Sequence, residues 1–341
     1  MHHSQMSRVV LALVVPSAFS LLVSACDGAG ARWDAGAADA GAADARVAED
    51  SGPPHPATLS AAGLYGDVVG GALADGVLPY EVRYPLWSDG SSKRRFLVLP
   101  EGASIDTSDP DGWRFPVGTR VFKEFAVDGR AIETRLLWKV GEGDWVRVAY
   151  LHRADGSDAD AVPDGAVDAL GTDHDVPDRA ACFNCHRGAA DFVLGVSALQ
   201  LDRASFDAWS SSGVLLGGTR WVEPPGDEAQ GAALGYLHAN CGHCHGDRHP
   251  LAMHRTLRLS LPVSVEDPLD APAWQTSVRR DAFHEIGGAR RLLVPGEPDA
   301  SQIYIRMGLR DELAMPPVGT EVVDDVGRAF VERWIRESPL P

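Results

Sequence analysis

Two copies of the pattern Cys-x-x-Cys-His, at residues 182–186 and 241–245, constrain this chain more than any other feature. Cysteines three positions apart lie on one side of a helical turn, and the adjoining histidine lies beside them. Two thiols so placed can add to the two vinyl groups of one haem, while the histidine binds the iron as an axial ligand. The sequence therefore predicts two covalently attached haems c, haem 1 on Cys182, Cys185 and His186, and haem 2 on Cys241, Cys244 and His245.

Three other interpretations of the cysteines stay open. A zinc site could use both Cys-x-x-Cys pairs, but residues 186–240 separate them, against about 15–20 residues in common zinc sites. A pair of disulfides or a thioredoxin-type redox pair would also fit the spacing of the thiols. None of the three gives the two histidines a role, whereas haem attachment uses every residue of the pattern.

The sixth ligand of haem 2 is predicted to be Met315. It stands in a Met-Pro-Pro sequence seventy positions after His245, on a segment that two prolines stiffen. A thioether is a common partner of histidine at a haem iron, although methionines more often fill a core. Met307 is the alternative ligand. It lies on an expected helix over 300–309, a position better suited to packing against the edge of the porphyrin.

For haem 1 the predicted sixth ligand is His174, because no methionine lies between the two motifs. The alternative for a loop histidine is exposure to solvent, and three other histidines are further candidates: His152, His238 and His254. Two histidine ligands lower a haem potential relative to a histidine–methionine pair. The expected arrangement is a low-potential haem 1 that feeds a higher-potential haem 2.

The N-terminus reads as an export signal. Arg8 is followed by an interrupted apolar run, and Val-Ser-Ala precedes Cys26 as in a bacterial lipobox. Residues 1–25 are therefore the expected lipoprotein signal peptide, Cys26 the lipidated residue, and 26–58 a disordered tether rich in Ala, Asp and Gly. We expect an exported lipoprotein that faces the periplasm or the cell surface and touches the membrane only through its lipid anchor. An ordinary signal peptide with an incidental cysteine is the alternative.

The predicted fold class is α+β with several domains. Short apolar runs broken by Gly, Pro and Asp indicate an antiparallel β-rich module over 59–165, and a haem 1 segment follows over 166–226. Residues 227–341 are expected to form a mostly helical, cytochrome c-like domain around haem 2. Four strands are expected in the module, at 93–99, 119–127, 131–140 and 145–152.

Two helices, over 227–240 and 324–337, are expected to frame haem 2. Gly231 and Gly235 on the first helix would let it cross the second closely. That pairing is the reason for the prediction of a helical domain.

Several segments resemble a bacterial family of exported dihaem c-type cytochromes. The matching residues are Tyr84 to Gly90, Lys93 to Arg95, Phe115 to Thr119, Glu133 to Leu137 and Met315 to Pro317. The resemblance runs from about residue 80 to the C-terminus and implies a β-rich module, a haem-bearing segment, a cytochrome c-like domain and electron transfer. One departure is His152, where the family pattern has a tryptophan.

The expected function is electron transfer between redox protein partners, without catalysis. The net charge of −17 and the absence of a basic cluster exclude nucleic acid as a partner. The alternative is a dihaem peroxidase or an oxidase of a small substrate, which would need an open sixth position at haem 1. A binding protein with sensor haems is a third possibility.

Overall fold

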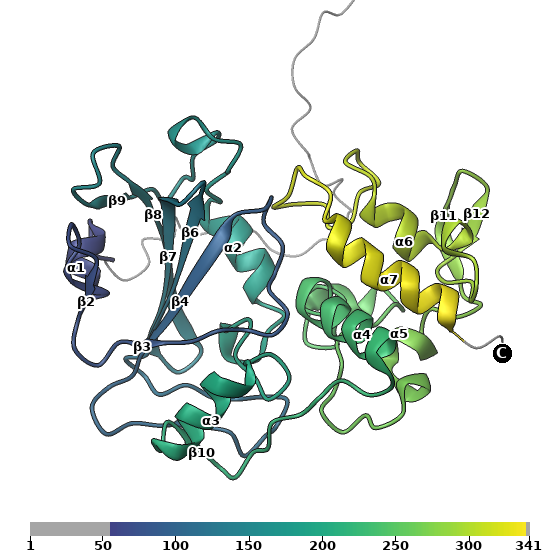
Figure 1. Cartoon of the computed structure of the whole chain (residues 1–341), viewed down its shortest axis with the longest axis horizontal. Helices are drawn as coiled ribbons and strands as arrows, with labels where there is room; N and C mark the ends of the chain where they lie inside the picture. Colours follow the sequence, from purple (N-terminus) through teal and green to yellow (C-terminus); the bar gives the residue numbers. More distant parts are fainter. Residues whose placement is uncertain (1–54, 339–341) are drawn as a thin grey trace, which may run out of the picture. The chain divides into compact units, whose positions relative to one another are not determined.

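Residues 55–338 are described by the computed structural model, so the predicted signal peptide, Cys26 and most of the predicted tether lie outside the described residues. The end of the predicted tether is bonded to the body of the protein. The carbonyl of Pro56 accepts a hydrogen bond from the Tyr150 hydroxyl at 3.1 Å, and that of Ala57 accepts one from the Ala161 amide at 3.0 Å. The described part is an α+β structure, as predicted (Figure 1).

An antiparallel six-stranded sheet forms the β-rich region, in the order β3-β4-β6-β7-β8-β9. All four predicted strands are confirmed, each within one residue at its ends. The turn between β6 and β7 uses Asp128 and Gly129, which both have positive φ, as a tight hairpin requires. The six strands are β3 (Leu78–Pro79), β4 (Ser92–Val98), β6 (Arg120–Val127), β7 (Arg130–Gly141), β8 (Asp144–His152) and β9 (Ala159–Ala161).

Both faces of this sheet are covered, each by a different layer. The first face carries a buried cluster that includes Phe96, Phe122 and Tyr150 and packs against α1 (Leu59–Ala62). The opposite face carries a second cluster with Leu97 and Trp145, which packs against α3 (Arg203–Ser211). Side chains alternate between the faces of a strand, and charged residues such as Arg95, Glu124 and Lys139 are buried between the layers as well.

The other elements are short. Two small antiparallel pairs and one parallel pair occur, together with short helices: β1 (Tyr65–Asp67) with β2 (Ala72–Leu73), β11 (Asp281–Ile286) with β12 (Ala289–Arg291), β10 (Leu215–Leu216) with β5 (Ile105–Asp106), α5 (Pro272–Gln275), and the 3₁₀ turns η1 (Ala169–Gly171), η2 (Ala190–Phe192), η3 (Pro250–Met253), η4 (Pro268–Asp270) and η5 (Pro298–Ala300). None of the described helices is both long and apolar enough to span a bilayer.

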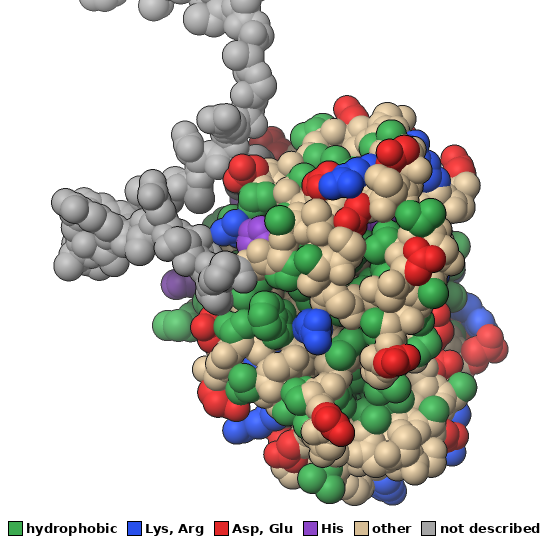
Figure 2. Space-filling view, turned by 90° about the vertical axis from the view of Figure 1, so that its left-hand side faces the viewer, with side chains coloured by type: hydrophobic (Ala, Val, Ile, Leu, Met, Phe, Trp, Pro, Cys, Tyr) green, Lys and Arg blue, Asp and Glu red, His purple; other side chains and the backbone are tan. Residues whose placement is uncertain are grey.

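On the face drawn in Figure 2, acidic and basic side chains are interspersed with apolar and uncharged ones.

The C-terminal part is built on helices α4 (Glu228–Asn240), α6 (Gln302–Met307) and α7 (Asp325–Glu337). A reciprocal capping box starts α4, in which Asp227 Oδ1 accepts from the Gln230 amide and Gln230 Oε1 accepts from the Asp227 amide, both at 2.9 Å. The two predicted framing helices are confirmed, and they pack against each other. Helix α6 is shorter than predicted because Ser301 is extended.

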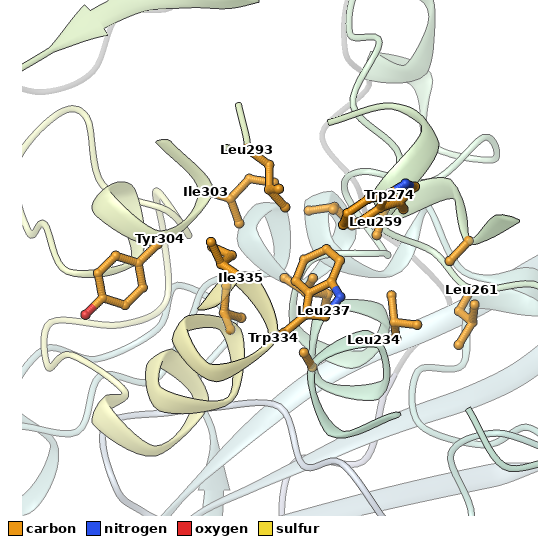
Figure 3. Close-up of a cluster of buried hydrophobic side chains, with 14 of the residues drawn as sticks. Leu234, Leu237, Leu259, Leu261, Trp274, Leu293, Ile303, Tyr304, Trp334 and Ile335 are labelled. Carbon is orange, nitrogen blue, oxygen red and sulfur yellow. The ribbon is translucent and has the colours of Figure 1, made fainter. Parts of the chain in front are cut away.

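A single apolar core joins these helices (Figure 3). Leu234 and Leu237 of α4 meet Trp334 and Ile335 of α7, and Trp334 packs edge-on against Trp274 with ring centroids 6.2 Å apart. The amphipathic pattern of residues 324–337 predicts this inner face of α7.

The glycine that permits the close crossing of α4 and α7 is Gly327 on α7. A Cβ at position 327 would lie 2.1 Å from the ring of Tyr236 on α4. The prediction that Gly231 and Gly235 serve this purpose is wrong. A Cβ on Gly231 would have only ordinary contacts, 3.5 Å or more away, and one on Gly235 would lie 2.3 Å from the ring of Tyr84.

Candidate functional site

The first Cys-x-x-Cys-His motif forms the C-terminal half of helix α2 (Arg179–His186), which lies against β8 (Figure 1). The Asp178 carboxylate caps the helix by accepting from the Ala181 amide at 2.7 Å. Within the helix Cys182, Cys185 and His186 are at positions i, i+3 and i+4, so their side chains share one face. This is the arrangement in which two thiols and one imidazole can meet the same planar group.

The imidazole of His186 is held in one tautomer. Its Nδ1 donates to the Phe192 carbonyl at 2.7 Å, which leaves Nε2 without a proton and free to bind a metal. Burial lowers the pKa of His186 to about 3, so the ring is neutral at physiological pH. A neutral, oriented imidazole is what an axial haem ligand requires.

The loop that supplies this carbonyl is fixed to the sheet by Asp191. Its carboxylate accepts from the Phe115 amide at 2.7 Å, from Lys139 Nζ at 2.9 Å and from Trp145 Nε1 at 3.2 Å. Asp191 and Phe192 both have positive φ, +46° and +63°. A backbone in this uncommon region persists where its surroundings hold it, and here the three donors to Asp191 do so.

The second motif follows α4 as a single tight turn. The amides of Cys244 and His245 both donate to the Cys241 carbonyl, at 3.1 and 2.8 Å. Burial lowers the pKa of His245 to about 4, partly opposed by the Leu257 carbonyl, so this imidazole is also neutral. Its Nδ1 is buried without a well-formed hydrogen bond within the described residues.

All four motif cysteines are free thiols in the structure. Burial raises the pKa of each thiol, to about 12 for Cys241 and about 11 for Cys244. Within residues 55–338 no three His, Cys, Asp or Glu side chains converge as a metal-ion site, so the zinc interpretation has no support there. Free thiols paired on a turn beside a neutral histidine fit the covalent attachment of a haem.

The two motifs touch each other. Gly188 follows the first motif, and a Cβ on it would lie 1.9 Å from the carbonyl oxygen of His243, in the middle of the second. His249 bridges the same contact, because its Nε2 lies 3.2 Å from the Asn184 carbonyl oxygen and 3.4 Å from Arg187 Nε. Two motifs that residues 187–240 separate in sequence are therefore neighbours in the fold.

Met315 lies on the loop after α6. Its amide donates to the Arg306 carbonyl at 3.0 Å, and the charge of Arg306 helps to lower the pKa of His245 after burial and Arg255. Met307 is instead buried in the core of the helical part. Ligation by Met315 and packing of Met307 against the porphyrin edge both stay predictions.

His174 lies beneath the sheet and is already paired. Its Nε2 is 2.9 Å from Oε2 of the buried Glu133, and its ring stacks at a tilt on Phe125. Burial would raise the pKa of Glu133, but the charge of Arg135 and the hydrogen bonds from His174 and Arg135 lower it. Ligation by His174 stays a prediction, and it would require the bond to Glu133 to break.

The other histidines that the sequence offers as sixth ligands of haem 1 are hydrogen-bonded elsewhere or exposed. The Nε2 of His152 lies 2.9 Å from the Thr134 hydroxyl, on the sheet face opposite α2. The Nδ1 of His238 accepts from the Leu261 amide at 2.9 Å, and His254 is exposed.

Three cations form a row across the sheet on the face that α2 covers. Lys123 of β6 stands directly opposite Arg95 of β4 and Arg135 of β7, and we call these three residues the cationic row. Burial, then the charges of Arg95, Arg135 and Lys93, lower the pKa of Lys123 well below its usual value. Like charges in facing positions are destabilising, so the row suits an anionic group such as the propionates of a haem.

The segment that carries the family resemblance links the sheet region to the second motif. The Trp87 amide donates to Asn240 Oδ1 at 2.8 Å, just before Cys241. The Asp89 carboxylate accepts from the Thr320 hydroxyl and from two backbone amides of residues 321–322, on the loop that carries Met315. Comparisons with protein-family models, curated proteins and solved structures find no match to the chain.

Four residues of this site could not be found from the sequence: Lys123, Asp191, His243 and His249. Each is placed by contacts between segments far apart in the chain. The sequence holds one signal for Lys123, because it shares a strand face with the apolar residues Val121 and Phe125. In a strand whose two faces are both covered, a lysine on that face is buried.

Proposed function

We propose that this protein is an exported dihaem c-type cytochrome that transfers electrons. Cys182 and Cys185 would hold haem 1, and Cys241 and Cys244 would hold haem 2. The observation that carries the proposal is the contact between two Cys-x-x-Cys-His turns, each with its thiols free and its terminal histidine neutral and half-buried.

A bound haem supplies an iron that accepts and releases one electron. The chain's own residues prepare each position for it. Phe192 fixes the tautomer of His186, and partial burial keeps both imidazoles neutral by lowering their pKa. Outer contacts that orient a ligating histidine are a general feature of metal sites.

The direct contact of Gly188 with His243 favours electron exchange between the two haems within one chain. It brings the backbone of one attachment turn against that of the other, with no side chain between them. Electrons would enter at one haem, pass across this contact and leave at the other, to redox protein partners.

The remaining parts of the proposal rest on the sequence. Helices α4 and α7, with the loop of Met315, would form a cytochrome c-like domain around haem 2. Cys26 would anchor the protein to a membrane by its lipid, facing the periplasm or the cell surface.

One observation favours a second candidate, a dihaem peroxidase or small-substrate oxidase. His174, the ligand predicted for haem 1, is engaged by Glu133. If no other side chain replaced it, the iron of haem 1 would have an open position where a substrate could bind.

Spectra of the purified ferric holoprotein separate these candidates. The carrier requires a pyridine haemochrome with two haems c per chain and two low-spin irons that do not bind carbon monoxide when reduced. A high-spin iron that reacts with peroxide would support the enzyme instead, and a protein without covalent haem would refute both.

A further inference from the structure

The strongest unexplained group in the described residues is His243, the third residue of the second motif. Its own motif does not require it, because Cys241, Cys244 and His245 complete that motif. Its Nδ1 is buried without a well-formed hydrogen bond, although the Ala239 carbonyl lies near enough to the ring to raise its pKa, and burial lowers that pKa to about 4. A neutral imidazole beside a carbonyl keeps one ring nitrogen unprotonated, and that nitrogen can bind a metal.

The position of His243 is next to the first motif. Its carbonyl oxygen is the atom against which Gly188 packs. The His243 ring also lies near enough to His186 for its protonated form to lower the pKa of His186, and the charge of Lys123 lowers the pKa of both imidazoles. His243 therefore belongs to the surroundings of haem 1 although it lies in the sequence of the haem 2 motif.

The other histidines near haem 1 are committed elsewhere. His174 is bound to Glu133, and His152 bonds to Thr134 on the far face of the sheet. His249 uses both ring nitrogens, Nδ1 with the Leu251 amide and Nε2 with the Asn184 carbonyl.

We propose that His243 is the sixth ligand of the haem 1 iron, opposite His186. This rests on the proposed function, since it presupposes that haem 1 is attached at Cys182 and Cys185. The second motif would then serve both haems, because Cys241, Cys244 and His245 hold haem 2 while the intervening His243 reaches haem 1. Haem 1 would be saturated, and the coordination sphere of one haem would be joined by two peptide bonds to the axial ligand of the other.

The test replaces His243 with glycine in the full-length holoprotein and records electron paramagnetic resonance and absorption spectra of the ferric form. We expect two low-spin signals in the parent protein and the loss of one in His243→Gly, replaced by a high-spin signal. Added imidazole should restore the low-spin signal by entering the space that the side chain leaves. His243→Gln is the second variant, and it should lose the same signal without creating that space.

Two further variants complete the comparison. His238→Ala removes another buried histidine of the same segment, one whose Nδ1 already accepts from Leu261, and it should keep both low-spin signals. His174→Ala should also keep both.

The outcomes are distinct. Two low-spin signals in both His243 variants, or a high-spin haem in the parent protein, would overturn the assignment while leaving the dihaem cytochrome in place. Loss of the signal in His174→Ala or in Lys123→Gln would do the same and would name the true ligand. Absence of covalent haem from the parent protein would refute the proposed function itself.

Discussion

At the scale of single residues, the two terminal histidines of the motifs are prepared in different ways. His186 is oriented by a backbone carbonyl, which in turn depends on Asp191 and its bonds to Lys139 and Trp145. His245 has no comparable support within the described residues. The imidazole of His186 is therefore oriented by a well-formed hydrogen bond, whereas that of His245 has only the weaker influence of the Leu257 carbonyl.

Replacing Met315 tests its predicted bond to the haem 2 iron. Met315→Ala should abolish the far-red methionine–iron charge-transfer band and lower the potential of haem 2, because the thioether favours the ferrous iron. Met307→Ala is the control, because it removes a buried core methionine at a cost of about 2–5 kcal/mol in the free energy of unfolding. Persistence of the band in Met315→Ala would contradict the assignment.

Lys123 provides a test of the cationic row. Haem propionates against the row would keep Lys123 protonated despite its lowered pKa. Lys123→Gln then removes a positive charge near haem 1, so the ferric state is favoured and the potential of haem 1 should fall. We expect the equilibrium constant of reduction to fall roughly three- to tenfold, where tenfold corresponds to about 59 mV for one electron.

The matched control for Lys123→Gln is Arg94→Gln. Arg94 lies on the opposite face of the sheet, where it pairs with Glu124 at 2.6 Å. Spectroelectrochemical titration should find its haem potentials unchanged. Equal shifts in both variants would mean that the row has no special relation to haem 1.

At the scale of elements, the important contact is the one between the end of α2 and the turn after α4. It depends on the absence of a side chain at position 188, where even a methyl group would overlap the His243 carbonyl. This contact is the physical basis for treating the two motifs as one site.

Gly188→Ala should force the two motifs apart. Overpacking of this kind costs about 1–3 kcal/mol, which chemical denaturation can measure, and we expect a mixed-spin haem 1 as well. Gly231→Ala is the control, because that glycine is in α4 with only ordinary neighbours, and it should gain about 0.5–1 kcal/mol. If Gly188→Ala were as stable as the parent protein, the two turns would not be in tight contact.

The elements themselves were largely predictable from the sequence. Strands β6 and β7 followed from alternating apolar residues and from Asp128 and Gly129, since local patterning and turn chemistry act over a few residues. The contacts between elements were not predictable. Tyr84 fills the space beside Gly235, and Gly327 accommodates Tyr236, but nothing near these glycines in the sequence indicates which partner will pack there.

The candidate site also contains residues that the sequence predicts and contacts that it does not. The motif cysteines and histidines are contiguous, so spacing alone singled them out. Glu133 pairs with His174 across 41 positions in the sequence. A long-range pair of this kind cannot be predicted from a single sequence, and neither can the position of His243 beside the first motif.

At the scale of the whole molecule, contact between the two motifs means that the two proposed haems would influence each other's reduction. Reduction of one haem removes a positive charge beside the other, so the second electron should be harder to add. Removing haem 1 by Cys182→Ala with Cys185→Ala should change the equilibrium constant of reduction of haem 2 by roughly three- to tenfold, as expected for two nearby charges. Potentiometric titration measures the change, and an unaltered haem 2 potential would contradict electrostatic coupling.

The central claim is that each motif binds one haem covalently, and the mass of the denatured chain tests it most directly. After reduction and unfolding, the full-length protein from a host that matures c-type cytochromes should carry the mass of two haems. The Cys182→Ala, Cys185→Ala double variant and its Cys241→Ala, Cys244→Ala counterpart should each carry one. A parent chain without added haem mass, or one whose haem mass is unaffected by both double variants, would contradict the account.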